Sequence, residues 1–205
     1  MSAARFIAIE GLDGSGGSTQ LALLKAEFER RGQACVVSRE PSDGPVGKLI
    51  RAQLAGGVSD GVLPYLFAAD RRDHFDSVIL PALARGENVL SDRCALSSLA
   101  YQAEAHGLGK VMRLNEDFPP PDLVILLDLD PAECLARIAA RGLPRDRFET
   151  LERLRTIAAG YDAAVRAVGA VGAEPPGRHW TVVRVPADGT ADDVAARVTK
   201  AVWPA

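Results

Sequence analysis

The stretch that decides the fold is Gly11-Leu12-Asp13-Gly14-Ser15-Gly16-Gly17-Ser18. It stands between an apolar run at residues 5–10, typical of a buried strand, and residues 18–31, whose pattern predicts a helix that Gly32 ends. Small residues at such a turn let backbone N–H groups wrap a phosphate at the positive end of the helix. The stretch therefore predicts a phosphate-binding P-loop. The structural alternative is a plain glycine-rich turn.

One position of this loop departs from the P-loop motif. A lysine is expected after the final motif glycine, and Gly17 stands in its place. A lysine about 4 Å from a phosphate charge contributes roughly 4 kcal/mol at an intermediate dielectric. The lysines of the chain are Lys25, Lys48, Lys110 and Lys200. None is an obvious replacement, so an arginine is the better candidate for the missing charge.

Beyond the loop, apolar runs alternate with helical segments, which is typical of a parallel sheet covered by helices on both faces. Further strands are predicted at 34–38, 88–92, 123–129 and 180–185. Helices are predicted at 62–85, with a bend or cap at Pro81, and at 95–106 and 131–141. After an arginine-rich turn, another helix is predicted to run to about residue 168, and a last helix is predicted at 190–202. Loops are predicted at 39–47 and 169–177. With no internal repeat or domain boundary, residues 1–205 are expected to form a single domain.

Composition excludes several functional classes. The chain has 205 residues, a formal net charge of -3 and a pI of about 5.7, so no general nucleic-acid-binding surface is expected. Its cysteines, Cys35, Cys94 and Cys134, show no ligand spacing, and no apolar run approaches the roughly 18 residues that span a bilayer. We therefore expect a cytoplasmic protein with no membrane partner.

Several segments, in order, resemble thymidylate kinases. They are the opening Phe6 to Gly16, Arg39-Glu40-Pro41 with Gly47 to Arg51, Leu66 to His74, Ser91 to Cys94 with Ser97 to Gln102, and Ala140 to Gly142 with Asp146 to Glu149. Together they are spread over most of the first 150 residues. Cys94 departs from the tyrosine of the family, as Gly17 departs from its lysine.

The resemblance implies a three-layer P-loop nucleoside-monophosphate kinase fold, with a five-stranded parallel sheet flanked by helices. It implies Mg²⁺-dependent transfer of the γ-phosphate of ATP to dTMP, giving dTDP and ADP in dTTP synthesis, and a homodimer. The residues it implies for binding the ATP phosphates are Gly11, Leu12, Asp13, Gly14, Ser15, Gly16, Gly17, Ser18 and Thr19. Ser18 and Asp92 are implied to bind the metal, Asp92 through water.

The same resemblance assigns the dTMP site. Phe67 is expected to stack on thymine, and Arg71 and Gln102 to read its edge with help from Ser98. Tyr101 is expected beside the sugar, and Arg39, Arg51 and Arg93 near the phosphate. The implied catalytic residues are Asp13, Arg93 and three arginines of a lid around residues 141–150, namely Arg141, Arg145 and Arg147.

Structural alternatives stay open for these residues. Phe67 at helical spacing is ordinarily a core residue, residues 70–73 a solvated helix face, and Asp92-Arg93 a structural ion pair. The lid arginines have the alternative of a solvated basic turn. For the whole protein, the alternatives are a nucleotide-binding protein impaired in catalysis by the loss of the lysine, and a kinase for another pyrimidine monophosphate.

Overall fold

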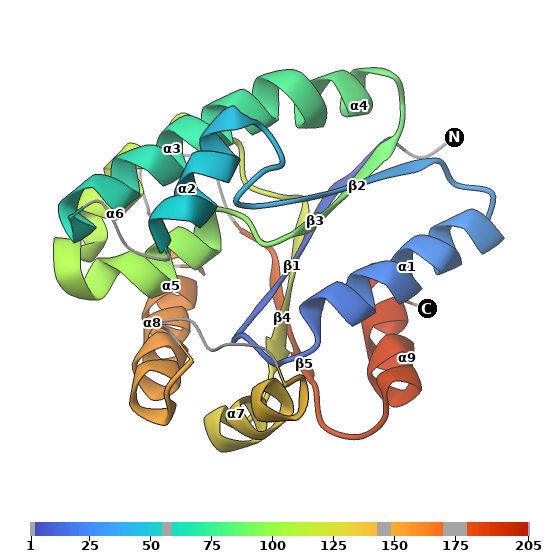
Figure 1. Cartoon of the computed structure of the whole chain (residues 1–205). Helices are drawn as coiled ribbons and strands as arrows, with labels where there is room; N and C mark the ends of the chain where they lie inside the picture. The colour runs from blue at the N-terminus through green and yellow to red at the C-terminus, as the bar shows by residue number, and fades with distance from the viewer. Residues whose placement is uncertain (1–2, 55–58, 143–148, 170–179, 205) are drawn as a thin grey trace.

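The structure, a computed structural model, describes residues 3–54, 59–142, 149–169 and 180–204. Its sheet has five strands, all parallel, in the order β2-β3-β1-β4-β5 (Figure 1). The strands are β1 (Phe6–Gly11), β2 (Cys35–Arg39), β3 (Asn88–Asp92), β4 (Leu123–Asp128) and β5 (Val182–Pro186). The predicted five-stranded parallel sheet is confirmed.

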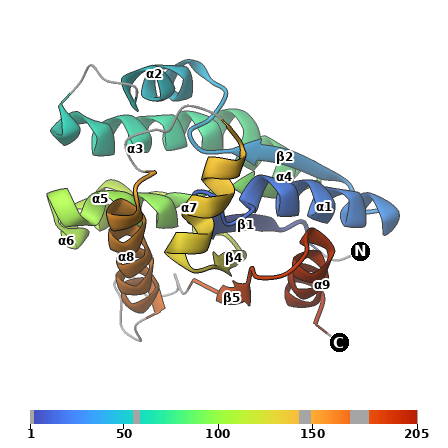
Figure 2. The same cartoon turned by 60° about the horizontal axis from the view of Figure 1, so that its bottom comes forward.

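Helices cover both faces of the sheet, as Figures 1 and 2 show. On one face, α1 (Gly17–Arg30) packs against α9 (Ala191–Val202). On the other face, α4 (Leu80–Ala84) contacts β3, and α5 (Ala95–His106) contacts β1. The remaining helices pack around α5 and one another, namely α2 (Pro45–Leu54), α3 (Leu63–His74), α6 (Leu108–Leu114), α7 (Pro131–Ala140) and α8 (Leu151–Gly169).

The structure corrects the predicted elements in a few places. The loop expected at 39–47 ends at Gly44, because α2 begins at Pro45, where a proline fits the first helical turn. The seven-residue α6 was not predicted, since so short a helix carries little periodicity. The loop expected at 169–177 lies outside the described residues, apart from Gly169 at the end of α8.

The helical segment predicted at 62–85 is interrupted by its proline. It consists of the 3₁₀ turn η1 (Asp60–Val62), α3, the π-helical turn η2 (Phe75–Ile79) and α4, whose first turn contains Pro81. A proline lacks the N–H that a continuous helix needs, and its ring clashes with the preceding turn. The wider π turn accommodates this break, so the predicted effect of Pro81 is confirmed.

The core lies along the central strands and sets the position of the site. Every residue of β1 is buried, and so are residues 123–127 of β4, because helices cover both faces of a parallel sheet. The edge strand β2 is only half-buried. The carboxyl ends of β1, β3 and β4 open toward the loops, where open parallel sheets bind ligands.

Candidate active site

The glycine-rich loop joins β1 to α1 in the geometry that a P-loop requires. Gly14 and Gly16 have φ values of 87° and 102°, in the left-handed region that favours glycine. A Cβ at Gly14 would lie 2.4 Å from the carbonyl oxygen of Cys134 in α7, so α7 packs directly on the loop. Gly16 caps α1 without a side-chain hydrogen bond, which leaves the first-turn N–H groups available to an anion.

A cavity of about 340 Å³ lies over this loop. It is lined by residues 9–19 together with Asp92, Arg93 and Arg141, so every predicted phosphate-binding residue contributes to it. Among the described residues that line this cavity, Arg93 and Arg141 are the cations. The structure therefore places two arginines at the loop from which the lysine is missing.

The site of the missing lysine has room for a side chain. A Cβ at Gly17 would have Asp92 Oδ1 as its near neighbour at 3.4 Å, an ordinary contact. The other carboxylate oxygen of Asp92 accepts a hydrogen bond of 2.8 Å from Ser18 Oγ. The two residues predicted to bind the metal are thus brought together at the carboxyl end of β3.

A second cavity, of about 450 Å³, adjoins the first. Six of the predicted acceptor residues line it, namely Phe67 and Arg71 from α3, Arg93, and Ser98, Tyr101 and Gln102 from α5. Cys94 stands where the family that the sequence resembles has a tyrosine, and it lines this cavity as well. Burial raises the pKa of its thiol well above the usual value, so Cys94 stays protonated.

Asp13 and Arg93 line both cavities and so mark the place where the two meet. Arg93 Nη2 lies 2.7 Å from Asp13 Oδ1, and Tyr101 donates to the other oxygen of Asp13 at 3.1 Å. Arg93 also has a positive φ of 75°, which is unusual for a residue with a side chain. Such backbone strain concentrates at functional sites, where the surrounding structure maintains it.

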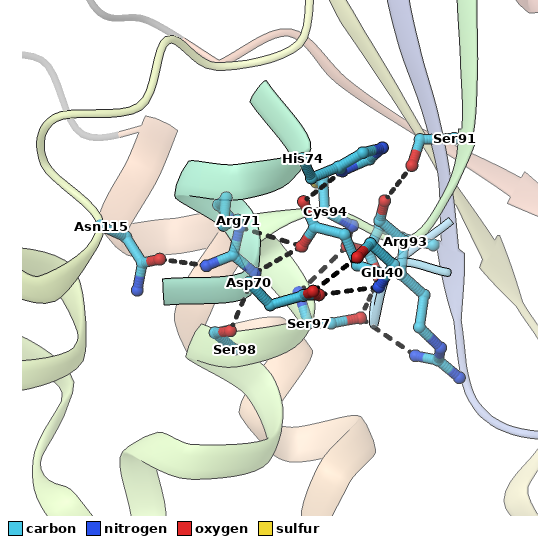
Figure 3. A network of polar contacts seen from close by, with 12 residues as sticks. Glu40, Asp70, Arg71, His74, Ser91, Arg93, Cys94, Ser97, Ser98 and Asn115 are labelled. Carbon is cyan, nitrogen blue, oxygen red and sulfur yellow. Dashed lines mark hydrogen bonds and ion pairs between the residues drawn. The ribbon is translucent and has the colours of Figure 1, made fainter. Parts of the chain in front are cut away.

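Arg71 is buried at the far wall of the second cavity, in the network of Figure 3. Its Nε and Nη2 donate to Glu40 Oε2 at 2.9 and 2.6 Å, Nη2 also donates to Ser98 Oγ at 3.1 Å, and Nη1 donates to Asn115 Oδ1. A guanidinium has five N–H groups. These bonds occupy four of them and leave one on Nη1 for a ligand.

Glu40 is the buried counter-ion of Arg71. Burial by itself raises the pKa of this carboxyl, but the guanidinium of Arg71 and the nearby His74 more than offset it and hold the pKa below its usual value. Glu40 is therefore ionised near neutral pH. It keeps the Arg71 guanidinium in place at the cavity wall.

Gln102 lines the same cavity, and its amide oxygen is unpaired. Its Oε1 is buried and has no hydrogen-bond partner among the described residues. A buried acceptor without a partner costs about 1–3 kcal/mol. A ligand with an N–H group at this place would remove that cost.

Two predicted phosphate-binding residues lie apart from both cavities. Arg39 pairs with Asp43 at 2.5 Å on the surface, and Arg51 donates to the carbonyl of Pro41 at 2.7 Å and lies 3.3 Å from Asp43. Arg39 and Arg51 line neither of the cavities described above. Their role in binding a phosphate stays a prediction.

The lid is described only at its two ends. Arg141 follows α7 and lines the P-loop cavity, where it forms no ion pair with a described residue. Arg145 and Arg147 lie outside the described residues.

Sequence reasoning missed four contributors to the site. Glu10, Glu40, Asn115 and Tyr161 are all buried and hold cavity-lining side chains. Glu10 had a local signal, because it is a carboxylate at the end of an apolar strand just before the loop. Asn115 and Tyr161 had none, since their partners are distant in the sequence.

Within the described ranges, no group of three or more His, Cys, Asp or Glu side chains is arranged to hold a metal ion by itself. In the same ranges, no helix has the length and apolar character to cross a membrane.

Comparisons with known proteins agree with this geometry. The family model described as thymidylate kinase matches residues 9–171. A thymidylate kinase of Xanthomonas oryzae pv. oryzae is 42% identical over 187 residues, which cover 89% of this chain and 77% of that protein. A probable thymidylate kinase of Thermococcus kodakarensis is 41% identical over 167 residues (76% and 82%), and one of Pyrococcus horikoshii 43% over 164 residues (76% and 80%).

Proposed function

The chain belongs to the thymidylate kinase family, and from this membership and its two adjoining cavities we infer how it carries out the family reaction. The reaction transfers the γ-phosphoryl group of ATP to the 5′-phosphate of dTMP and gives dTDP and ADP. The observation that carries the assignment of the cavities is that both share Asp13 and Arg93. A donor phosphate over the P-loop and an acceptor phosphate in the second cavity meet there.

The P-loop cavity is the proposed site of the ATP phosphates. The backbone N–H groups of residues 14–19 and the positive end of α1 attract the phosphate oxygens. Phosphoryl transfer needs alignment of the two nucleotides and stabilisation of charge more than a covalent intermediate. The P-loop supplies the alignment, and Arg93 and Arg141 supply positive charge at the cavity.

Ser18 and Asp92 are the proposed ligands of the magnesium ion that accompanies ATP. Their hydroxyl and carboxylate oxygens are the type of donor that Mg²⁺ prefers, and they lie within 2.8 Å of each other. When bound, the metal neutralises charge on the phosphates. Asp92 orients the Ser18 hydroxyl by accepting its hydrogen bond.

The second cavity is the proposed dTMP site. Thymine offers the carbonyl O4 beside the N3–H group. The free N–H on Arg71 Nη1 matches the carbonyl, and the unpaired Oε1 of Gln102 matches the N–H group. Cytosine reverses this edge, with an acceptor at N3 and an amine at position 4, and it would leave both protein groups unpaired. Phe67 supplies an aromatic face for stacking, and Tyr101 lies toward Asp13 and the sugar.

Arg141 is the proposed replacement for the missing lysine, alone or with Arg145 and Arg147 of the same lid. It lines the P-loop cavity and is free of ion pairs with described residues. An arginine supplied at the transferred phosphoryl group stabilises the charge that develops during transfer, and such an arginine is worth about 10³ to 10⁵ in rate.

We further propose that the protein lies in the cytoplasm, the compartment that holds both ATP and dTMP. We also propose that it forms a homodimer. Three exposed apolar side chains lie on the successive elements α2, η1 and α3, namely Leu49 at 46%, Val62 at 38% and Tyr65 at 52%. Apolar side chains that gather into one exposed surface are typical of a protein interface.

A coupled ADP-release assay with dTMP, dUMP, dCMP and dGMP tests the reaction. We expect Mg²⁺-dependent turnover with dTMP well above that with the other acceptors. Folded protein that binds dTMP and shows no turnover with ATP or other nucleoside triphosphates would support the impaired nucleotide-binding protein instead. Faster turnover with dUMP or dCMP would support a kinase for another pyrimidine monophosphate.

A further inference from the structure

Two hydroxyl groups hold the guanidinium of Arg93 at the junction of the cavities. Arg93 Nη1 donates to Ser97 Oγ at 3.0 Å and to Tyr161 Oη at 3.1 Å. Both hydroxyls also lie on one oxygen of Glu10, with Ser97 Oγ 2.6 Å and Tyr161 Oη 2.8 Å from Glu10 Oε2. The two hydroxyls therefore bridge a buried carboxylate and the arginine.

The direction of these bonds follows from the chemistry of the groups. A carboxylate only accepts hydrogen bonds, a guanidinium only donates them, and a hydroxyl has one proton to give. The Gly11 carbonyl is a further acceptor for Tyr161 at 3.1 Å, but the Glu10 oxygen is closer, at 2.8 Å. When Glu10 Oε2 accepts a hydrogen bond from each hydroxyl, the oxygens of Ser97 and Tyr161 turn their lone pairs to Arg93.

The other oxygen of Glu10 holds the backbone that follows Arg93. Glu10 Oε1 accepts from the N–H groups of Cys94 at 2.8 Å and Ser97 at 3.0 Å, at the N-terminus of α5. Cys94, the N-cap residue, makes no capping bond with its own side chain. Glu10 thus replaces the missing cap from a distant strand and fixes the peptide next to the positive φ of Arg93.

We propose that Glu10 is the positioning residue of Arg93, with one oxygen holding the start of α5 and the other setting the direction of the Ser97 and Tyr161 hydroxyls. This inference rests on the proposed function, in which Arg93 binds phosphate at the junction. It adds to that function a buried carboxylate whose two oxygens are both held by hydrogen bonds within the protein and which decides whether Arg93 points at the substrate.

Glu10→Gln tests the role of the second oxygen selectively. The two backbone N–H groups of α5 can only donate, so they keep the amide oxygen of the glutamine on their side. The NH₂ group then faces the two hydroxyls, donates to them, and competes with Arg93 for their lone pairs. The cap of α5 survives, while the arginine loses its fixed position.

The measurement is the binding of dTMP and of thymidine, which lacks the phosphate, together with kcat. In Glu10→Gln we expect dTMP to bind about tenfold more weakly, the scale of one hydrogen bond to a charged group, and kcat to fall at least as far. Thymidine should bind within about twofold of the parent, since its base contacts are untouched. Equal weakening of both ligands, or no change in dTMP binding and kcat, would overturn the proposal.

Two further variants make the result decisive. Glu40→Gln is the matched control. The buried carboxylate of Glu40 holds Arg71, so this variant should weaken the binding of thymidine and the binding of dTMP by the same factor. The double variant Ser97→Ala with Tyr161→Phe removes both bridges and leaves Glu10 with its backbone bonds. This double variant should reproduce the selective loss of dTMP binding even where Glu10→Gln does not fold. A ratio of dTMP affinity to thymidine affinity equal to that of the parent would overturn the proposal. A parent protein that fails to prefer dTMP over thymidine would instead contradict the proposed function.

Discussion

At the scale of single residues, Gln102 carries the clearest test of the base site. Its buried Oε1 has no partner in the described structure, so replacing it with an apolar group of similar shape removes a cost from the free protein. We expect Gln102→Leu to leave the melting temperature unchanged or to raise it. The same variant should weaken dTMP binding by about 1–3 kcal/mol, because the thymine N–H then lacks its acceptor.

Calorimetric titration with dTMP and with ATP, beside a thermal melt, measures both effects. Gln33→Leu is the matched control, because Gln33 Oε1 is also buried and unpaired but lines neither cavity. It should leave dTMP binding unchanged. Equal weakening of ATP and dTMP in Gln102→Leu would contradict the base-reading role.

Arg71 supports a second prediction at this scale, about stability and pH. Arg71→Met leaves the buried carboxylate of Glu40 without its cation, which typically costs about 3–5 kcal/mol at pH 7. In the parent the pKa of Glu40 is lowered, so its stabilisation is present above the unfolded pKa and is lost as the pH falls through the folded pKa. In the variant the pKa rises by desolvation, and protonation relieves the buried charge as the pH falls.

The stability difference between parent and Arg71→Met should therefore shrink toward acid. Urea unfolding at pH 7 and pH 4 measures it. A difference that stays constant, or grows at pH 4, would show that Glu40 is not the group left unpaired.

At the scale of elements, we propose that the lid supplies the positive charge that the P-loop lacks at Gly17. We expect Arg141→Ala to lower kcat more than it weakens ATP binding, because a lid arginine acts mainly on the transition state. Gly17→Lys should partly restore kcat in the Arg141→Ala background, since a Cβ at this position meets only Asp92 Oδ1, at 3.4 Å, among the described residues. Steady-state kinetics of the single and double variants measure the rescue.

Arg145→Ala and Arg147→Ala extend the comparison to the part of the lid outside the described residues. If all three alanine variants keep the parental kcat, the lid does not supply the missing charge. If only Arg145→Ala or Arg147→Ala lowers kcat, the residue that replaces the missing lysine is one of these two arginines and not Arg141.

At the scale of the whole molecule, the proposed homodimer depends on the exposed apolar residues of α2, η1 and α3. We expect the chain to sediment as a dimer and Tyr65→Glu or Leu49→Glu to shift it toward monomer, because a stable interface buries roughly 800 Å² per partner with few charges at its centre. Analytical ultracentrifugation measures the shift. Leu80→Glu is the control, because Leu80 on α4 is similarly exposed, at 44%, and lies outside that set. A monomeric parent would contradict the homodimer.

The sequence by itself determined the features that local pattern controls. The strand, glycine turn and helix around residues 5–31 are close to their predicted places, and all five strands were found, because buried parallel strands are apolar and glycine turns stand between them. The resemblance placed six acceptor residues that do line one cavity. The short helix α6 was missed because so few residues show no clear period.

Only the tertiary structure decided how these side chains are paired. Arg93 meets Asp13 across 80 residues of chain, and Glu10 meets Tyr161 across 151. The same packing left Arg39 and Arg51 on Asp43, and neither of them lines a cavity described above. A carboxyl edge of parallel strands collects residues from distant segments, and burial then requires each charge and hydroxyl gathered there to find a partner. Local pattern predicts which residues reach that edge, and the partner each one finds depends on the packing of α5, α7 and α8 around it.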